Sequence, residues 1–196
     1  MRKMFLFVLA AAAFLAMIPA QNAQAQSRSE APKVEVGAQY TLLRFRDFGV
    51  NDATDSGVGG RITVNVTNSL GVEGVVNFFP QGRINFATLS SVLDSDRMQG
   101  LFGVKYGLRS KKAGIFAKVR PGFMRFSQGT PALGTSSSAT QFALDYGGVV
   151  ELYPARAFAL RFDVGDTIIR YDNTAAFVTP FFSHNLQIST GLALRF

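Results

Sequence analysis

The chain has 196 residues, with 20 Lys or Arg against 13 Asp or Glu, and it contains no cysteine. A chain without cysteine has neither disulfides nor thiolate metal ligands, which excludes a disulfide-stabilised miniprotein and a dithiol redox site. The basic residues are spread along the chain without forming a cluster, so nucleic-acid binding is not expected.

The N-terminus has the layout of a secretory signal peptide. Arg2 and Lys3 precede an uncharged apolar run over 4–18, and Ala23 and Ala25 stand where a signal peptidase reads small residues. The run is shorter than the roughly 20 residues that a spanning helix needs. We therefore expect cleavage after Ala25 rather than an uncleaved anchor.

The expected organisation is a cleaved signal peptide at 1–25, a short periplasmic leader at 26–32 and one domain at 33–196. Removal of Arg2 and Lys3 leaves 18 basic against 13 acidic residues, a net charge of +5. A mature chain of this length suits a single domain.

Apolar and polar residues alternate along this domain with a period of two. Phe158, Phe162 and Val164, for example, alternate with Arg161 and Asp163. Such alternation is typical of strands with one apolar and one polar face. The pattern recurs in eight segments, at 33–46, 57–67, 70–79, 97–108, 113–126, 139–152, 157–169 and 184–196.

Short and long connections alternate between these segments. The short ones read TNS, RSKK and PAR, and the long ones read DFGVNDATD, PQGRINFATLSSVLDSD, SQGTPALGTSSS and YDNTAAFVTPFFS. This pattern is typical of an up-and-down barrel with two unequal ends. With eight strands, both termini would lie on the short-turn side.

The composition of the polar face indicates which face of the barrel points outward. It is rich in Gly and Ala, which a narrow eight-stranded interior needs and a solvated exterior does not. On a lipid-facing wall each Arg or Lys at mid-depth would cost about 2–4 kcal/mol, whereas opposite charges inside a lumen can pair. We therefore expect an apolar outer wall rather than a soluble lipocalin-like barrel. The charged residues expected inside, as a pore lining or a structural network, are Glu35, Arg61, Glu73, Lys105, Lys118, Arg120, Asp145, Glu151, Arg161, Asp163 and Arg195.

Aromatic residues are expected at the two membrane interfaces, where they form girdles in such barrels. The expected positions are Tyr106, Phe158 and Phe196 near the short turns, and Phe78, Phe123 and Tyr171 near the long loops. Pro121 interrupts the fifth segment. Because a closed barrel has no edge strand to tolerate its missing N–H, we expect a β-bulge there, and the facing of 122–126 stays open.

The last segment, LQISTGLALRF, places four aliphatic residues and Phe196 on one face. Together with the signal peptide and the alternating connections, it resembles the small bacterial outer-membrane barrels of the OmpA transmembrane-domain and opacity-adhesin types. The resemblance implies an all-β, eight-stranded antiparallel up-and-down transmembrane β-barrel in the outer membrane, with both termini periplasmic. It also implies that Phe196 is an assembly signal for the outer-membrane assembly machinery.

Because a fold hosts several functions, the fold alone leaves the activity open. We expect a non-enzymatic barrel, surrounded by outer-membrane lipid, with a structural role or with four long loops that meet an extracellular ligand or host surface. A narrow passive pore and a lipid A-modifying enzyme are the alternatives. Ser183 and the only histidine, His184, are adjacent and so point to opposite faces of a strand, which is unfavourable for a serine hydrolase.

No catalytic residue, metal site or cofactor is expected. Six apolar loop residues are expected to be adhesive, to cap the barrel or to extend its strands: Ile84, Phe86, Leu89, Phe177, Phe181 and Phe182.

Overall fold

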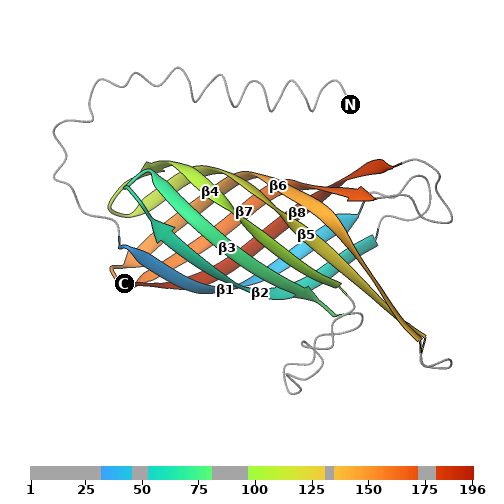
Figure 1. Ribbon diagram of the computed structural model, residues 1–196. Coiled ribbons are helices and arrows are strands. Elements are labelled where there is room, and N and C mark those ends of the chain that lie inside the picture. The colour runs from blue at the N-terminus through green and yellow to red at the C-terminus, as the bar shows by residue number, and fades with distance from the viewer. Residues whose placement is uncertain (1–31, 46–52, 81–96, 131–134, 172–179) are drawn as a thin grey trace. The chain divides into compact units, whose positions relative to one another are not determined.

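The computed structural model describes residues 32–45, 53–80, 97–130, 135–171 and 180–196. These residues form one closed barrel in which each strand pairs antiparallel with its neighbours in sequence and the last strand pairs with the first (Figure 1). The strands are β1 (Val34–Phe45), β2 (Ala53–Asn65), β3 (Leu70–Phe79), β4 (Arg97–Arg109), β5 (Ala113–Thr130), β6 (Thr135–Ala155), β7 (Phe158–Tyr171) and β8 (Phe181–Arg195). The expected eight-stranded up-and-down barrel is confirmed.

Within those ranges, no helix is long and apolar enough to cross a membrane. The signal peptide expected at 1–25 and most of the leader expected at 26–32 lie outside the described residues.

The first and last strands close the barrel at the short-turn end. Glu35 on β1 lies opposite Arg195 on β8 in the ladder. The N–H of Phe196 donates to the carbonyl of Val34 at 2.9 Å, so backbone pairing continues to the final residue. The start of β1 and the end of β8 therefore meet on the side of the short turns.

Two hairpins are longer than the alternation predicted. β5 and β6 remain paired out to Thr130 and Thr135, so most of the link expected at 127–138 is strand. Glycine is depleted in strands, and at Gly129 cross-strand pairing with Ser136 holds the chain extended. β8 begins at Phe181, which makes Phe181 and Phe182 strand residues. The other four apolar loop residues lie outside the described part of the chain.

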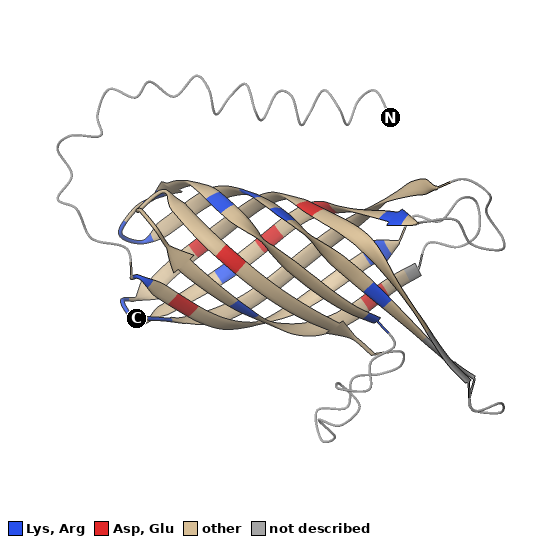
Figure 2. Cartoon of the chain, in the orientation of Figure 1, with Lys and Arg blue, Asp and Glu red and all other residues tan. Residues whose placement is uncertain are grey.

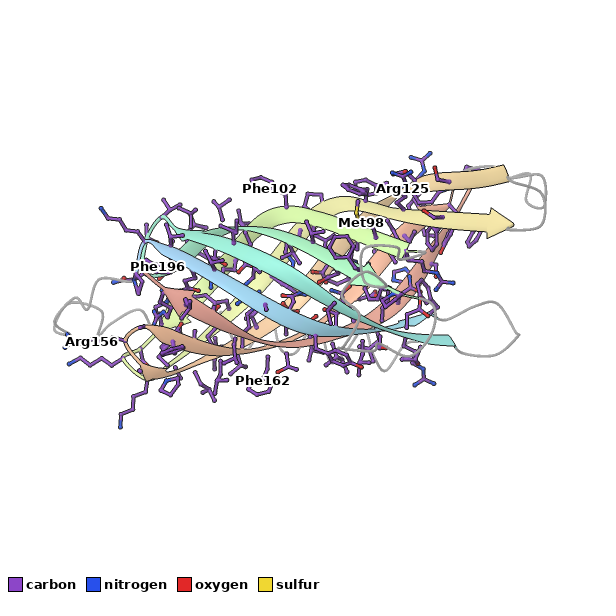
Figure 3. The ribbon with its side chains drawn as sticks, turned by 90° about the horizontal axis from the view of Figure 1, so that it is seen from below. Met98, Phe102, Arg125, Arg156, Phe162 and Phe196 are labelled. Carbon is purple, nitrogen blue, oxygen red and sulfur yellow. The ribbon has the colours of Figure 1, made fainter. Side chains whose placement is uncertain are left out.

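Apolar side chains cover the outer wall, as expected. Phe102 on β4 is 66% exposed and Leu192 on β8 is 57% exposed, whereas the residues next to them on the strands, Leu101 and Ala193, are buried. Phe102 and Phe162 project from opposite sides of the barrel (Figure 3). An apolar surface of this kind suits lipid, so the lipocalin-like alternative is wrong.

The expected bulge at Pro121 is absent. The β4–β5 register is the same on both sides of it, with Val104 opposite Val119 and Leu101 opposite Gly122, and only the bridges between these pairs are missing. On the other side Pro121 pairs with Leu144 without a shift. Residues 122–126 therefore keep the facing of the rest of β5.

Aromatic residues at the short-turn end follow the expected girdle: Tyr106, Phe158 and Phe196 are all exposed. At the other end, Phe123 is exposed, but the prediction for Tyr171 is wrong. Tyr171 packs with Phe126 against the apolar cluster inside the barrel and stacks on Phe181, with ring centroids 4.9 Å apart. An odd-numbered residue of β7 faces inward, and this parity continues to the end of the strand.

Candidate functional site

The interior of the barrel holds a connected set of charged side chains, whose strand positions are shown in Figure 2. Lys118 and Arg120 share the inward face of β5, and the ladder places Arg120 directly opposite Asp145 on β6. Asp145 Oδ2 accepts from Arg120 Nε at 2.8 Å and from Lys118 Nζ at 2.7 Å. Lys118 also pairs with Asp163 on β7. These four groups form one half of the network.

The other half is centred on Glu73 and Arg161. Arg161 Nη2 donates to Glu73 Oε2 at 2.9 Å, and Arg161 also pairs with Glu151 at 3.2 Å. Lys105 pairs with Glu151 and lies 3.7 Å from an oxygen of Glu35. The two halves join where Arg120 Nη1 lies 3.4 Å from Glu73 Oε2.

The structure places every charged residue that the strand parity assigned to the interior inside the barrel. Ten of these eleven residues are at most 4% exposed, and the eleventh, Arg195, has a side chain that is 6% exposed and pairs with Glu35 at 3.4 Å. Arg61 differs from the others, because it is buried but makes no ion pair with any described carboxylate.

One interior cation was missed. Arg109 was assigned to the turn RSKK, but β4 continues through it, and its side chain lies inside the barrel at 5% exposure. It lies 3.5 Å from Glu35 and 3.6 Å from Glu151, and it donates to Asn65 Oδ1 at 3.0 Å. The parity of Lys105, extended by four residues, would have identified it.

A second interior group consists of amides and hydroxyls, which the sequence reasoning did not single out. Asn77 accepts from Gln39 at 2.9 Å and donates to Gln99 at 2.7 Å. Gln99 in turn donates to Gln187 at 3.0 Å, and Gln187 accepts from Thr167 at 2.8 Å. This chain of neutral groups links β1, β3, β4, β7 and β8 across the interior, and Gln187 Nε2 is the one buried amide nitrogen of these residues that finds no acceptor in the described part of the chain.

An apolar cluster fills the interior at the long-loop end. Its buried members are Leu43, Phe45, Val75, Phe79, Leu101, Met124, Ala143 and Ile169. Arg97 lies over the rings of Phe45 and Phe126, at 4.9 and 5.6 Å from the ring centroids, and pairs with Asp55. The alternation alone suggested a polar interior over the whole length of the barrel. The structure shows instead that the interior is apolar at this end.

Aromatic rings also close the interior at the short-turn end. The Arg195 guanidinium lies 4.0 Å from the ring centroid of Tyr153, and the Lys105 ammonium lies 4.7 Å from that of Phe116. Tyr153 Oη donates to Glu151 Oε2 at 2.7 Å, which ties this layer to the charged network. The quadrupole of an aromatic ring attracts a cation above its face, and this attraction partly replaces the solvation that a buried cation loses.

A small polar cluster lies on the outer wall, and sequence reasoning missed it because its members come from three strands. Asp166 Oδ2 accepts from Tyr146 Oη at 3.0 Å and lies 2.7 Å from His184 Nδ1. Ser183 points inward, where its hydroxyl donates to Asn185 Oδ1 at 3.0 Å. Among the described residues, no serine or threonine hydroxyl contacts His184, so these groups do not assemble a hydrolase triad.

Comparison with known proteins agrees with this geometry. A family model for the outer membrane protein beta-barrel domain matches residues 9–196. Neisserial surface protein A is similar in structure, with a TM-score of 0.60 at 14% identity, over 85% of this chain and 99% of that one. Ail, the attachment invasion locus protein of Yersinia pestis, solved with the heparin analogue sucrose octasulfate, gives 0.54 at 14% identity over the same shares. At these identities the likeness shows the fold alone, and no curated protein matches the sequence.

Proposed function

Because the chain belongs to the family of outer-membrane β-barrel proteins, we propose that it is a non-enzymatic, non-conducting barrel that presents its long-loop end to partners outside the cell. The observation that carries this proposal is the filled interior. The charged network is followed by an apolar cluster at one end and by an aromatic layer at the other. A hydrated ion would lose its water at each layer, at a cost of several kcal/mol.

A rigid wall with a filled core is a suitable support for binding at the loops. The β5–β6 hairpin favours this use, because its ladder continues from Ser127 opposite Ser138 to Thr130 opposite Thr135. β4 ends earlier, where Arg97 pairs with Phe126. The hairpin therefore projects past its neighbours (Figure 1).

The proposed orientation places both termini and the short turns in the periplasm and the projecting hairpin outside. Barrels of this family have short periplasmic turns and longer extracellular loops, which supports this choice. Phe196 is 70% exposed on the outer wall at the short-turn end, where the proposed assembly machinery would meet it.

The partner class that we propose is an anionic surface glycan. Exposed arginines lie near the long-loop ends of three strands: Arg44, Arg125 and Arg170. Guanidinium groups suit sulfate and phosphate recognition. The Ail structure contains a sulfated sugar, so heparin is a practical first probe for this chain. Loss of heparin retention in a triple Arg→Gln variant, with unchanged barrel folding, would support this choice; wild type that is not retained would exclude it.

The absence of cysteine provides a test of the orientation and of surface presentation. Ser138→Cys places one thiol on the projecting hairpin, and Lys111→Cys places one thiol on a short turn. A poly(ethylene glycol) maleimide too large for porins should label the first variant on intact cells. It should label the second only after the outer membrane is opened. Labelling of Lys111→Cys alone on intact cells would overturn the proposed orientation.

A further inference from the structure

One buried cation in the barrel interior has no carboxylate partner among the described residues. Arg61 on β2 points inward and is 4% exposed. In the part of the chain that the structure describes, Arg61 Nε has no hydrogen-bond acceptor, and no Asp or Glu forms an ion pair with the guanidinium. Burial of an unpaired charge is among the most unfavourable arrangements in a protein interior. Arginine does not escape this cost by losing its proton.

The carboxylates near Arg61 already serve other cations. Glu73 pairs with Arg161 and Arg120, and Glu151 pairs with Lys105 and Arg161. Glu35 lies near Lys105, Arg109 and Arg195. These three carboxylates attract Arg61 but form no ion pair with it, and the positive charge of Arg161 repels it.

The charge balance of the interior is also uneven. The described interior carboxylates are five: Glu35, Glu73, Asp145, Glu151 and Asp163. The described interior cations are seven: Arg61, Lys105, Arg109, Lys118, Arg120, Arg161 and Arg195. The excess is two positive charges, since the pair of Arg97 and Asp55 is neutral by itself. The closing layers keep bulk solvent from screening this excess.

Unused donors accompany the excess charge. Besides Arg61 Nε, the buried atoms Arg161 Nε, Arg109 Nε and Arg109 Nη1 have no hydrogen-bond acceptor among the described residues. A water molecule would satisfy such a donor but would leave the charge. An anion satisfies both, through charge-assisted hydrogen bonds.

We propose that the barrel interior binds one small monovalent anion of halide size at the Arg61 guanidinium. The size follows from the diameter of an eight-stranded barrel, whose interior is only just wide enough for its own side chains. The anion enters as the barrel closes during folding and stabilises the folded state by binding only to it. This site is independent of the function proposed above, because it needs neither conduction nor an external partner.

Bromide tests the proposal directly, because it scatters anomalously and replaces chloride. The full barrel is refolded in sodium bromide and crystallised, and anomalous differences are measured at the bromine edge. The expected result is a peak within hydrogen-bond distance of the Arg61 guanidinium. An anomalous map with no peak inside the barrel overturns the proposal, and this experiment needs no variant to fold.

Thermal unfolding gives a second readout. At equal ionic strength, sodium chloride should raise the Tm of the wild type by about 2–4 °C over sodium gluconate, whose anion is too large for the interior. Arg61→Gln should abolish the difference. Arg156→Gln, which removes the same charge from an exposed turn, should retain it. An equal Tm of the wild type in the two salts, or the same chloride effect in Arg61→Gln, would contradict an anion at Arg61.

Discussion

Arg120 and Asp145 face each other directly in the β5–β6 ladder, and Asp145 Oδ2 accepts from both Nε and Nη2 of Arg120, at 2.8 and 2.5 Å. The same carboxylate also holds Lys118. One side chain therefore neutralises two buried cations that strand alternation places on the same face of β5. The network depends on such shared carboxylates, because cations outnumber them inside the barrel.

Asp145→Ala should lower the free energy of unfolding by about 3–5 kcal/mol, because it removes the closest carboxylate of the buried Arg120 and one of the two carboxylates that pair with the buried Lys118. Urea unfolding in lipid vesicles, followed by heat-modifiable gel mobility, measures this loss. Asp55→Ala is the matched control, since its pair with Arg97 is partly exposed and should cost about 1 kcal/mol or less. Equal losses in the two variants would show that the interior is hydrated.

Leu42 and Leu43 are adjacent on β1 but occupy different environments: Leu43 is fully buried in the apolar cluster, and Leu42 is 36% exposed on the outer wall. Leu43→Ala should cost about 2–4 kcal/mol, because it leaves a cavity in the cluster. Leu42→Ala should cost clearly less, since lipid can occupy the vacated space. A larger loss for Leu42→Ala in the same unfolding assay would contradict the assignment of Leu43 to the interior cluster and of Leu42 to the outer wall.

Gly103 and Gly74 differ in the space that is available for a side chain. A Cβ at Gly103 would collide with the Val119 carbonyl and with Arg120 Cα, whereas a Cβ at Gly74 would meet nothing within 4 Å. Gly103→Ala should therefore destabilise the barrel by about 1–3 kcal/mol. Gly74→Ala should be neutral or stabilising, because alanine loses less backbone freedom on folding. Unchanged folding yield and stability in Gly103→Ala would contradict the close approach of β4 and β5.

Deletion of Phe196 should reduce outer-membrane levels more than it reduces refolding in detergent. The side chain is exposed, and its N–H pairs with Val34, so its loss removes an exposed aromatic ring and one closing hydrogen bond. Phe196→Tyr, which keeps an aromatic ring, should restore insertion. The comparison uses cell fractionation beside refolding of the purified chain. Normal outer-membrane levels of the deletion variant would argue against an assembly role.

Alternation along each strand was sufficient to predict the fold, the apolar wall and the inward charges, because the period of two is imposed by the strand itself. It could not predict that the β5–β6 hairpin continues beyond Phe126, since pairing between Ser127 and Ser138 holds that segment extended. The absence of a bulge at Pro121 has the same origin: continuous pairing with Leu144 maintains the register.

The division of the interior into layers was also beyond the sequence pattern. Leu43 directly follows Leu42, and alternation gives the facing of each residue but not its packing partners. The apolar cluster forms because the stagger of a closed barrel brings together inward residues of β1, β3, β4, β5, β6 and β7. The same holds for Arg61: parity predicted that it faces inward but could not show that it lacks a carboxylate partner among the described residues.

The central claim, that the barrel interior is closed, is tested most directly by single-channel recording of the purified protein in planar lipid bilayers. The account predicts no reproducible conductance steps for the wild type, because ions would have to cross both the apolar cluster and the aromatic layer. Discrete steps whose size changes in Lys118→Ala or Asp145→Ala would contradict it and would identify the charged network as the lining of a pore.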